Sequence, residues 1–556
     1  MAAFLKSHLS FQSCEEEKNE AINETAVERS STVSYPSWYS PVAGIYHSKF
    51  PTINLPSDSF LDVVSFIFSQ KHNGIHALID SSSGLSISYS KLFSLVKSMA
   101  SGLHRMGVKQ GDVILILLPN SVCFPVIFLA ALSVGAIATT MNPLSSMSEI
   151  KKQFSDSNAS LAFSVLDKVD ELVRALKGCH VVGVPEVLDF NYVSNDCSVF
   201  HKLISSDPNM APRPVIMQHD IAAILYSSGT TGKPKGVMIT HGNFIAMMEV
   251  FVRFEASLYD FPSNENVYLA VVPMFHVYGL SLFVMGLLSL GSTVVTMKKF
   301  DADEMVRAIE QYGVTHLHAS LKQVSCGAAP LSEKSIIEFI KTLPHVDFIQ
   351  GYGMTESTAV GTRGYNSNTV HKYSSVGLLS PNVEAKVVDW VTGSHLPPGS
   401  TGELWLRTPG NMRGYLNNLD ATMAALDKDG WLHTGDIVYF DKEGYLYVID
   451  RLKEVIKFKG FQVAPADLEA VLISHPEVHD AAIIGERDEE AGEIPVAFVV
   501  RKDGSSVSQQ ALMNYVAKQV APYKKVRRVY FCASIPRSAA GKILRRELRN
   551  LFASRL

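Results

Sequence analysis

An alternation of apolar strands and helices between residues 113 and 176 constrains the fold more than any other feature of the chain. The pattern predicts three strand–helix pairs, with strands at Val113–Leu118, Ala136–Thr140 and Leu161–Val165 and helices at Val122–Val134, Glu149–Ser155 and Val169–Leu176. Strands that alternate with helices form parallel βαβ units, whose helices cover both faces of the sheet. The sequence therefore predicts an α/β fold built on doubly wound sheets.

The chain has 556 residues, which is enough for several domains. Residues 1–34 are polar and predict a disordered N-terminal segment. Residues 35–449 predict a large domain, in which short strands and turn motifs after Ala385 indicate a small β subdomain. The pattern changes again near Asp450, so we expect residues 450–556 to form a smaller, mobile C-terminal α/β domain, with a helix that begins at Pro465.

Composition and targeting signals exclude some classes of function. The net charge of −4 gives no electrostatic reason to expect nucleic acid, and six scattered cysteines match neither a zinc site nor a disulfide framework. Prolines and polar residues interrupt the two longest apolar stretches, so we expect no membrane span. The final Ser554-Arg555-Leu556 is similar to the peroxisomal address Ser-Lys-Leu, which predicts recognition by the peroxisomal import receptor and, without it, a cytoplasmic location.

The segment Tyr226-Ser-Ser-Gly-Thr-Thr-Gly-Lys-Pro-Lys-Gly236 joins two predicted strands, Ile221–Leu225 and Val237–Thr240. Its hydroxyls, glycine N–H groups and two lysines suit a polyphosphate, because backbone N–H groups form anion-binding nests. The alternative is a solvated glycine–serine turn. A Walker loop is excluded, since Pro234 stands where that motif needs Ser or Thr before a helix. The segment predicts a flap over phosphates.

Two further polar segments complete a nucleotide site. In Gln350-Gly-Tyr-Gly-Met-Thr-Glu356, Tyr352 can stack on a base, Thr355 can contact a phosphate and Glu356 can hold Mg²⁺. Asp436, at the end of Trp431-Leu-His-Thr-Gly-Asp436, can accept both hydroxyls of a ribose. Ordinary turns are the alternative at both places.

Two cationic segments follow near and beyond the expected domain boundary. Asp450-Arg-Leu-Lys-Glu-Val-Ile-Lys-Phe-Lys-Gly460 interleaves four cations with apolar residues, which favours a partly buried strand over a solvated face. Pro536-Arg-Ser-Ala-Ala-Gly-Lys542 is a loop that ends in a lysine.

With these segments in this order, the chain from about Pro41 to Arg546 resembles the adenylate-forming acyl-CoA synthetases, and most closely the plant 4-coumarate–CoA ligases and their peroxisomal ligase-like relatives. The resemblance implies a two-step reaction with ATP, accompanied by Mg²⁺, and CoA as co-substrates. A carboxylate attacks the α-phosphate of ATP to give acyl-AMP and pyrophosphate. The small domain then turns about a hinge, and the CoA thiol displaces AMP. The acid is expected to be hydroxycinnamate-like or of a fatty or oxylipin type.

The resemblance also implies residue roles, motif by motif. The expected ATP ligands are Ser227, Ser228, Gly229, Thr230, Thr231, Lys235, Gln350, Gly351, Thr355, Asp436, Arg451 and Lys542. The expected catalytic residues are Lys542, which stabilises charge during adenylation, with His276, Lys457 and Gln462. Contacts to the acyl-adenylate are expected from Tyr278, Ala328, Lys453 and Lys457, contacts to CoA from Lys299, Lys459 and Gly460, and metal binding from Glu356.

One departure from the family pattern leaves an alternative open. His316-Leu-His-Ala319 runs directly into Ser320-Leu-Lys-Gln-Val324, where relatives insert a helix, so roughly twenty residues are missing from a wall of the acyl pocket. The alternative is a catalytically impaired splice or gene-model isoform that retains nucleotide binding. A luciferase-like monooxygenase has the same fold and motifs, whereas a peptide-synthetase adenylation module needs a carrier domain, for which too few residues follow Lys542.

Overall fold

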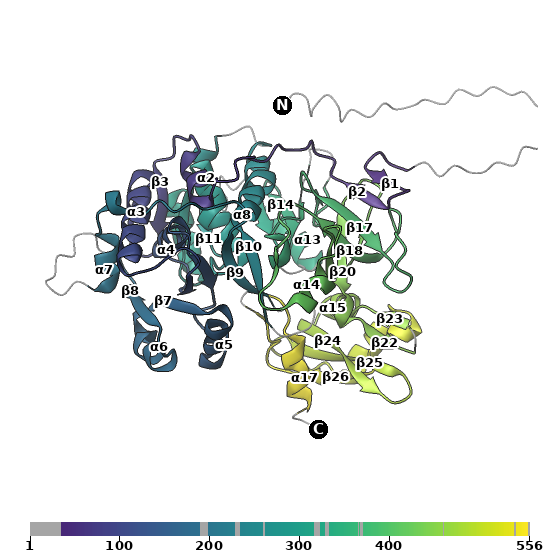
Figure 1. The fold of residues 1–556 in the computed structure, drawn as a ribbon. Helices are drawn as coiled ribbons and strands as arrows, with labels where there is room; N and C mark the ends of the chain where they lie inside the picture. The colour runs from purple at the N-terminus through teal and green to yellow at the C-terminus, as the bar shows by residue number, and fades with distance from the viewer. Residues whose placement is uncertain are drawn as a thin grey trace, which may run out of the picture.

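The computed structural model describes residues 35–188, 198–227, 234–258, 262–315, 323–327, 333–364, 366, 371–459, 461–538 and 541–553. The predicted disordered segment, residues 1–34, lies outside them. The described residues form five sheets, four in a large body and one in a smaller lobe (Figure 1). This arrangement confirms the predicted α/β class with a smaller C-terminal domain.

A seven-stranded sheet is the framework of the large domain. Its order is β19 (Gly414–Tyr415), β10 (Lys235–Thr240), β9 (Ile221–Ser227), β6 (Ile137–Thr140), β5 (Val113–Leu117), β7 (Ala159–Val165) and β8 (His180–Val184). The five strands from β9 to β8 are parallel. Strand β10 pairs antiparallel with β9, and β19 pairs antiparallel with β10. The predicted alternation is thus confirmed.

Helices connect and cover these strands where the sequence supplies caps and apolar faces. They are α3 (Tyr89–Arg105), α4 (Cys123–Ser133), α5 (Met147–Ser157), α6 (Val169–Ala175) and α7 (Val199–Ile204). Helix α4 is buried along almost its whole length because it is apolar on every side. Helix α5 begins with a capping box between Ser146 and Glu149 and ends at Asn158 in the left-handed conformation.

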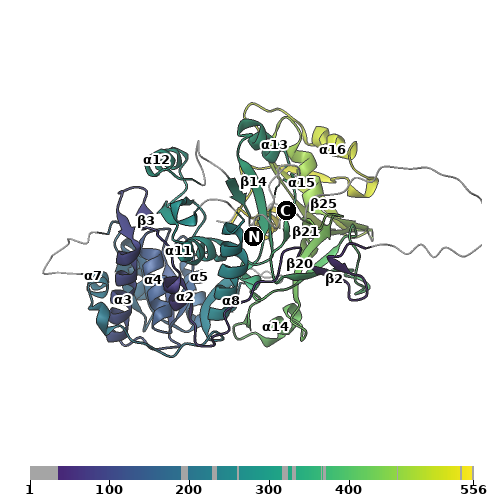
Figure 2. The same ribbon diagram turned by 90° about the horizontal axis from the view of Figure 1, so that it is seen from above.

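A second, four-stranded sheet lies in the same domain. Its order is β11 (Val267–Ala270), β12 (Thr293–Thr296), β3 (His76–Asp80) and β4 (Ser86–Ser88), and α12 (Ala302–Tyr312) follows it. Two composite helices belong to this region. Helix α8 (His241–Met247) continues through a π-helical stretch, Met248–Arg253, into α9 (Phe254–Ala256). Helix α10 (Val277–Gly279) likewise continues through a π-helical stretch, Leu280–Gly286, into α11 (Leu287–Leu290). Figure 2 shows α8 beside α2 (Val63–Ser69), on the part of the large domain that also holds α3 and α4 and lies away from the small lobe.

A third sheet of the large domain carries the glycine-rich motif. Its order is β13 (Gln323–Cys326), β14 (Asp347–Tyr352), β15 (Thr362–Arg363) and β16 (Leu378–Leu379), and α13 (Glu333–Thr342) connects β13 to β14. Strands β13 and β14 are parallel, and β15 runs antiparallel to β14.

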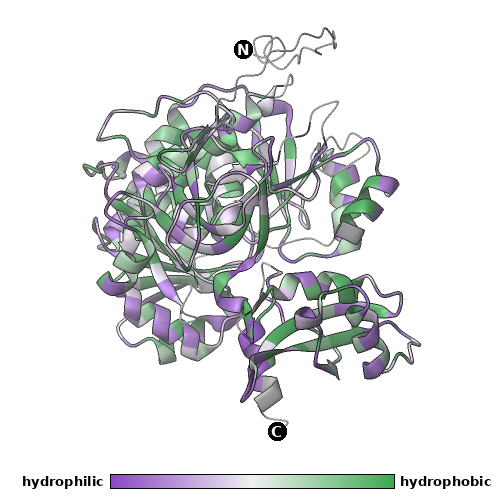
Figure 3. Ribbon diagram, turned by 90° about the vertical axis from the view of Figure 1, so that its right-hand side faces the viewer, coloured by the Kyte–Doolittle hydropathy of each residue, from purple (hydrophilic) through white to green (hydrophobic). Residues whose placement is uncertain are grey.

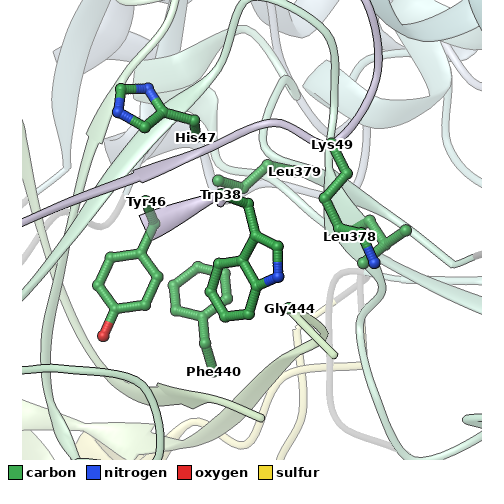
Figure 4. Close-up of a pocket in the computed structure, with 8 residues that line it drawn as sticks. All are labelled: Trp38, Tyr46, His47, Lys49, Leu378, Leu379, Phe440 and Gly444. Carbon is green, nitrogen blue, oxygen red and sulfur yellow. The ribbon is translucent and has the colours of Figure 1, made fainter. Parts of the chain in front are cut away.

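The β subdomain is a six-stranded antiparallel sheet. It contains β1 (Tyr39–Ser40), β2 (Ile45–His47), β17 (Glu384–Val388), β18 (Gly402–Arg407), β20 (Leu432–Phe440) and β21 (Leu446–Arg451), with α14 (Leu419–Ala425) beside it. A cavity of about 10 Å³ lies among Trp38, Tyr46 and Phe440 (Figure 4). It has room for about one water molecule, and Tyr46 stacks on Phe440 at 4.4 Å between ring centroids. This cavity therefore belongs to the packing of the sheet.

The small lobe has its own core. Strands β23 (Phe461–Val463), β22 (Ile456–Phe458), β25 (Gly492–Arg501) and β24 (Val478–Asp488) form a sheet that β26 (Arg528–Phe531) extends, and the helices are α15 (Pro465–Ile473), α16 (Gln509–Ala517) and α17 (Arg545–Ala553). Figure 3 shows this lobe set apart below the main body. Asp450 lies in β21, and its carboxylate accepts a hydrogen bond from the Ala466 N–H in the first turn of α15, at 2.9 Å. Among the described residues, no helix combines the length and hydrophobicity needed to cross a membrane.

Candidate active site

The site is built around a strained turn at the end of β14. Gly353 follows the strand, and a Cβ at this position would lie 2.3 Å from the carbonyl oxygen of Ala359. Thr358 and Ala359 both have positive φ angles, 51° and 64°. Backbone strain of this kind is concentrated at functional sites. The turn places Glu356 in the interior with only 3% of its surface exposed.

Glu356 joins the two ends of the phosphate-loop segment. Its Oε1 accepts hydrogen bonds from Ser227 Oγ at 2.6 Å and from the Tyr415 hydroxyl at 2.9 Å. The Lys235 ammonium lies over the Tyr415 ring, 4.6 Å from its centroid. Ser227 ends β9 and Lys235 begins β10, so one end of the predicted flap contacts this carboxylate directly and the other approaches it through Tyr415. The remaining predicted loop ligands, Ser228, Gly229, Thr230 and Thr231, lie outside the described residues.

Asp436 forms the second buried carboxylate, with 3% of its surface exposed. It accepts a hydrogen bond from the Tyr352 hydroxyl at 2.6 Å and an ion pair from Arg451 Nε at 2.9 Å. Burial and the Asp436 charge raise the pKa of Tyr352, and Asp436 raises the pKa of Arg451. The predicted ribose ligand is thus held by two residues on other strands. Nearby, Gln350 donates from Nε2 to the Tyr373 carbonyl at 2.7 Å.

Lys542 reaches this site from the small domain. Its loop is closed by hydrogen bonds from the Ser538 N–H to the Lys542 carbonyl, 2.8 Å, and from the Lys542 N–H to Ser538 Oγ, 3.2 Å. Burial lowers the pKa of Lys542, and so does the Arg451 charge, whereas Asp436 and Glu356 oppose that shift. The Lys542 ammonium therefore lies within electrostatic range of both carboxylates.

His276 lies on the side of the site where the acid is expected. It precedes α10, and its Nδ1 is buried without a hydrogen-bond partner in the described part of the chain. Burial, followed by the Lys542 charge, lowers the pKa of His276 to about 4, so the imidazole is neutral at neutral pH. Two residues further, the Tyr278 hydroxyl lies 3.4 Å from Ser325 Oγ on β13.

The predicted CoA and acyl-adenylate lysines are not all gathered here. Lys453, Lys457 and Lys459 have exposed side chains on the segment that enters the small domain. Although Lys453 is exposed as a residue, its ammonium is partly desolvated, and this burial and the Arg451 charge lower its pKa, which places it near the edge of the site. Lys459 has a φ of 46° in the turn between β22 and β23, and Lys299 is exposed after β12.

Of three other predicted residues, two are not described by the structure and one is described only in part. Gly460 and Ala328 lie outside the described residues, and for Gln462 the structure gives only the backbone, which pairs with Lys457.

Tyr415 and Ser325 belong to the site but were not predicted from the sequence. Tyr415 lies in the short strand β19, and no polar or glycine-rich pattern marks it as a ligand. Ser325 is a single small hydroxyl residue in β13, and only its proximity to the Tyr278 hydroxyl identifies it as part of the site.

Within the described ranges, no group of three or more His, Cys, Asp or Glu side chains is arranged to bind a metal. Mg²⁺ commonly takes one or two carboxylates and completes its coordination with substrate phosphates and water. Glu356 fits that role as a single carboxylate next to the phosphate loop.

Comparison with known proteins agrees with this site. The model of the AMP-binding enzyme family matches residues 67–320 and 318–416, and the model of the AMP-binding enzyme C-terminal domain matches residues 467–542. The "4-coumarate--CoA ligase-like 6" of Arabidopsis thaliana is 55% identical over 93% of this chain and 95% of that protein. The "Peroxisomal OPC-8:0-CoA ligase 1" of the same plant is 42% identical over 92% of this chain and 96% of that protein.

A solved structure of a Coenzyme A synthetase is also similar to this chain. The O-succinylbenzoate Coenzyme A Synthetase (MenE) from Bacillus subtilis, in complex with ATP and magnesium ion, superimposes with a TM-score of 0.75 at 25% identity. The match covers 87% of this chain and 99% of that one.

The two stretches of the family match meet at residues 318–320, where the sequence predicts missing residues. Residues 316–322 lie outside the described part of the structure. The comparisons do not support the alternative of an impaired isoform, since the match extends along nearly the whole of its curated relatives. The chain belongs to the AMP-binding enzyme family and, within it, to the 4-coumarate–CoA ligase-like acid–thiol ligases, which activate a carboxylate with ATP and then form a CoA thioester.

Proposed function

We propose that this enzyme activates a hydroxycinnamate-like acid or a fatty or oxylipin-type acid, and that Lys542 and the two buried carboxylates carry the first step. The observation behind the proposal is the meeting of Lys542 with Glu356 and Asp436, which belong to a different domain. A cation held near two buried carboxylates suits a reaction in which charge develops on phosphate oxygens.

In the first step, an oxygen of the acid attacks the α-phosphorus of ATP, the bond to the β-phosphate oxygen breaks, and pyrophosphate leaves. Lys542 stabilises the charge on the transferring phosphate. Asp436, oriented by Tyr352 and Arg451, accepts hydrogen bonds from the ribose hydroxyls. The flap residues and Lys235 hold the outer phosphates. Glu356 would hold Mg²⁺ through its carboxylate, and the ion would neutralise phosphate charge when bound with ATP.

In the second step, the sulfur of CoA attacks the acyl carbon, the bond to the AMP phosphate breaks, and AMP leaves. The residues assigned to CoA lie on exposed surfaces of both domains: Lys459 on the small domain and Lys299 on the large one. Thioester formation therefore requires the small domain to turn and bring Lys457, Lys459 and Gly460 to the acyl-adenylate.

The test separates the two steps. Purified protein is incubated with Mg²⁺, ATP and each of 4-coumarate, a medium-chain fatty acid and an oxo-cyclopentenyl octanoate, and pyrophosphate release is measured before and after CoA is added. We expect release that depends on the acid, followed by an acyl-CoA product identified by mass. Folded protein that releases no pyrophosphate with any acid contradicts the proposal.

We also propose a peroxisomal location. One relative is named as peroxisomal, and Ser554-Arg555-Leu556 is similar to the known address. A fluorescent protein fused to the N-terminus should enter peroxisomes, and the same fusion without residues 554–556 should remain in the cytosol. Import that is unchanged by the deletion contradicts this role for the three residues.

A further inference from the structure

A buried ion pair lies on the same face of the β13–β16 sheet as the expected acyl pocket. Arg363 pairs with Glu255, and their side chains are only 15% and 14% exposed. The guanidinium also lies over the Phe251 ring, 5.3 Å from its centroid. Burial raises the pKa of Glu255, and Arg363 opposes that shift. No role in the two-step reaction requires this pair.

The strand register shows where the pair points. In β14, Ile349 lies opposite Ser325 of β13, and Gly351 lies opposite Arg363 of β15. Paired residues and residues two apart share one face of a sheet. Ser325, Gly351 and Arg363 therefore lie on one face, and two inter-strand spacings with a two-residue offset along the strand put Ser325 and Arg363 about 12 Å apart.

Glycines make the surface between these side chains flat. A Cβ on Gly351 would lie 3.9 Å from Arg363 Cδ, and a Cβ on Gly327 would lie 3.4 Å from the Gly351 carbonyl oxygen. Arg363 thus extends over a floor at Gly351, which has no side chain, while Ile349 lies on the same face opposite Ser325. The other side of this floor is marked by Ser325, which faces the Tyr278 hydroxyl.

The opposite wall comes from two composite helices. Phe251 and Glu255 lie on the α8–α9 helix, and Tyr278 lies on the α10–α11 helix. The π-helical stretches of these two helices pack against each other. Stretches of π-helix are rare and often occur at functional sites. The floor, the two helices and the ion pair therefore border one region, in which Tyr278 lies beside Ser325 and His276 lies within electrostatic range of Lys542.

We infer that the Arg363–Glu255 pair determines acid specificity, by donating a hydrogen bond to a neutral oxygen, a ketone or a phenol, at the end of the acid remote from its carboxylate. This inference rests on the function proposed above and deepens it. A buried ion pair is weak evidence for stability, because desolvation offsets most of its attraction. Glu255 already neutralises Arg363, so the pair suits a neutral acceptor rather than a second carboxylate, which would have to displace Glu255.

Binding of non-hydrolysable acyl-adenylate analogues tests the inference without turnover. The probes are two pairs of acyl sulfamoyl-adenosines: 4-coumaroyl against cinnamoyl, and 8-oxodecanoyl against decanoyl. Calorimetry gives each Kd. A hydrogen bond to a charged donor predicts that the wild type binds at least one oxygenated probe about 10- to 100-fold more tightly than its partner, and the pair that shows the difference identifies the source of the oxygen.

The variant Arg363→Met/Glu255→Leu removes both charges together, so neither is left buried alone. It should bind the two members of each pair with similar affinity. The matched control, Arg407→Met/Glu384→Leu, removes an ion pair of the β subdomain and should keep the wild-type preference. Should the double variant fail to fold, Arg363→Lys keeps the charge but loses the planar fork and should reduce the preference.

Equal affinity of the wild type for both members of both pairs overturns the inference, as does a double variant that retains the preference. A wild type that binds the oxygenated probe preferentially, yet forms no acyl-CoA with any acid, refutes the proposed function and leaves this inference standing.

Discussion

Replacement of Lys542 by alanine separates the two half-reactions. The variant removes a small-domain cation that lies within electrostatic range of Asp436 and Glu356. Loss of a single preorganised group that stabilises transition-state charge costs about 10²- to 10³-fold in rate, or about 3–4 kcal/mol. We expect adenylation to fall by that factor, while thioester formation from preformed acyl-AMP falls much less, because no bond to a phosphate of ATP is made in that step.

The charge of Lys542, and with it the rate of adenylation, depends on pH. Burial and Arg451 lower its pKa below the ordinary 10.5, and a lysine is charged only below its pKa. Adenylation should therefore decline as the pH rises through a value below 10.5, and Lys542→Arg, which keeps its charge, should remove that decline.

The folding stability that Lys542 contributes changes with pH in the opposite direction to adenylation. Between the lowered pKa and the ordinary one, the unfolded chain binds the extra proton, so stability contributed by this group rises with pH. Lys542→Ala should therefore not lower the Tm at neutral pH, which distinguishes lost chemistry from lost structure.

The assay measures acid-dependent pyrophosphate release for the first half-reaction and acyl-CoA formed from synthetic acyl-AMP for the second. Lys442→Ala is the matched control, because the Lys442 side chain is 88% exposed and far from the site in the sheet, between β20 and β21. Equal losses in both half-reactions would refute the role assigned to Lys542, as would a variant with normal pyrophosphate release.

Three further changes test the geometry of the site. Gly353→Ala should lower stability by several kcal/mol and abolish adenylation, since its Cβ would lie 2.3 Å from the Ala359 carbonyl oxygen; a folded, active variant in thermal and pyrophosphate assays would contradict the turn. His276→Leu removes a buried Nδ1 without a described partner, so its Tm should be equal to or higher than that of the wild type while kcat/KM for the acid falls about tenfold or more; unchanged kcat/KM would exclude His276 from the acid site. Tyr352→Phe removes a 2.6 Å hydrogen bond to Asp436 and should weaken ATP binding by about tenfold in calorimetry, with little effect on the KM for CoA; a normal Kd for ATP would show that Tyr352 does not orient the ribose ligand.

Local pattern predicted most of the framework. The alternation between residues 113 and 176 gave strands and helices whose ends differ from the observed ones by at most two residues, because apolar periodicity and caps act within a few residues. The start of α15 at Pro465 followed from the same local rules.

Contacts between distant segments escaped prediction. Arg363 follows the Gln350–Glu356 motif closely, yet its partner Glu255 is 108 positions away, and neither residue stands in a polar cluster. Tyr415 reaches Glu356 only because β19 pairs with β10. The predicted stacking role of Tyr352 gave no hint that its hydroxyl bonds Asp436. Such pairings depend on sheet order and register, which local patterns do not determine.

Adjacent residues at the domain junction connect the catalytic site to the small domain. Arg451 holds Asp436 in the large domain, while Asp450, one residue earlier, accepts a hydrogen bond from the first turn of α15. Burial raises the pKa of Asp450, and the Arg545 charge opposes that shift. We therefore expect a turn of the small domain to pivot at Asp450 and Arg451 and to move Lys542 away from Asp436 and Glu356. We therefore expect the same movement that ends adenylation to free the site for CoA, because Lys542 and Lys459 belong to the same lobe.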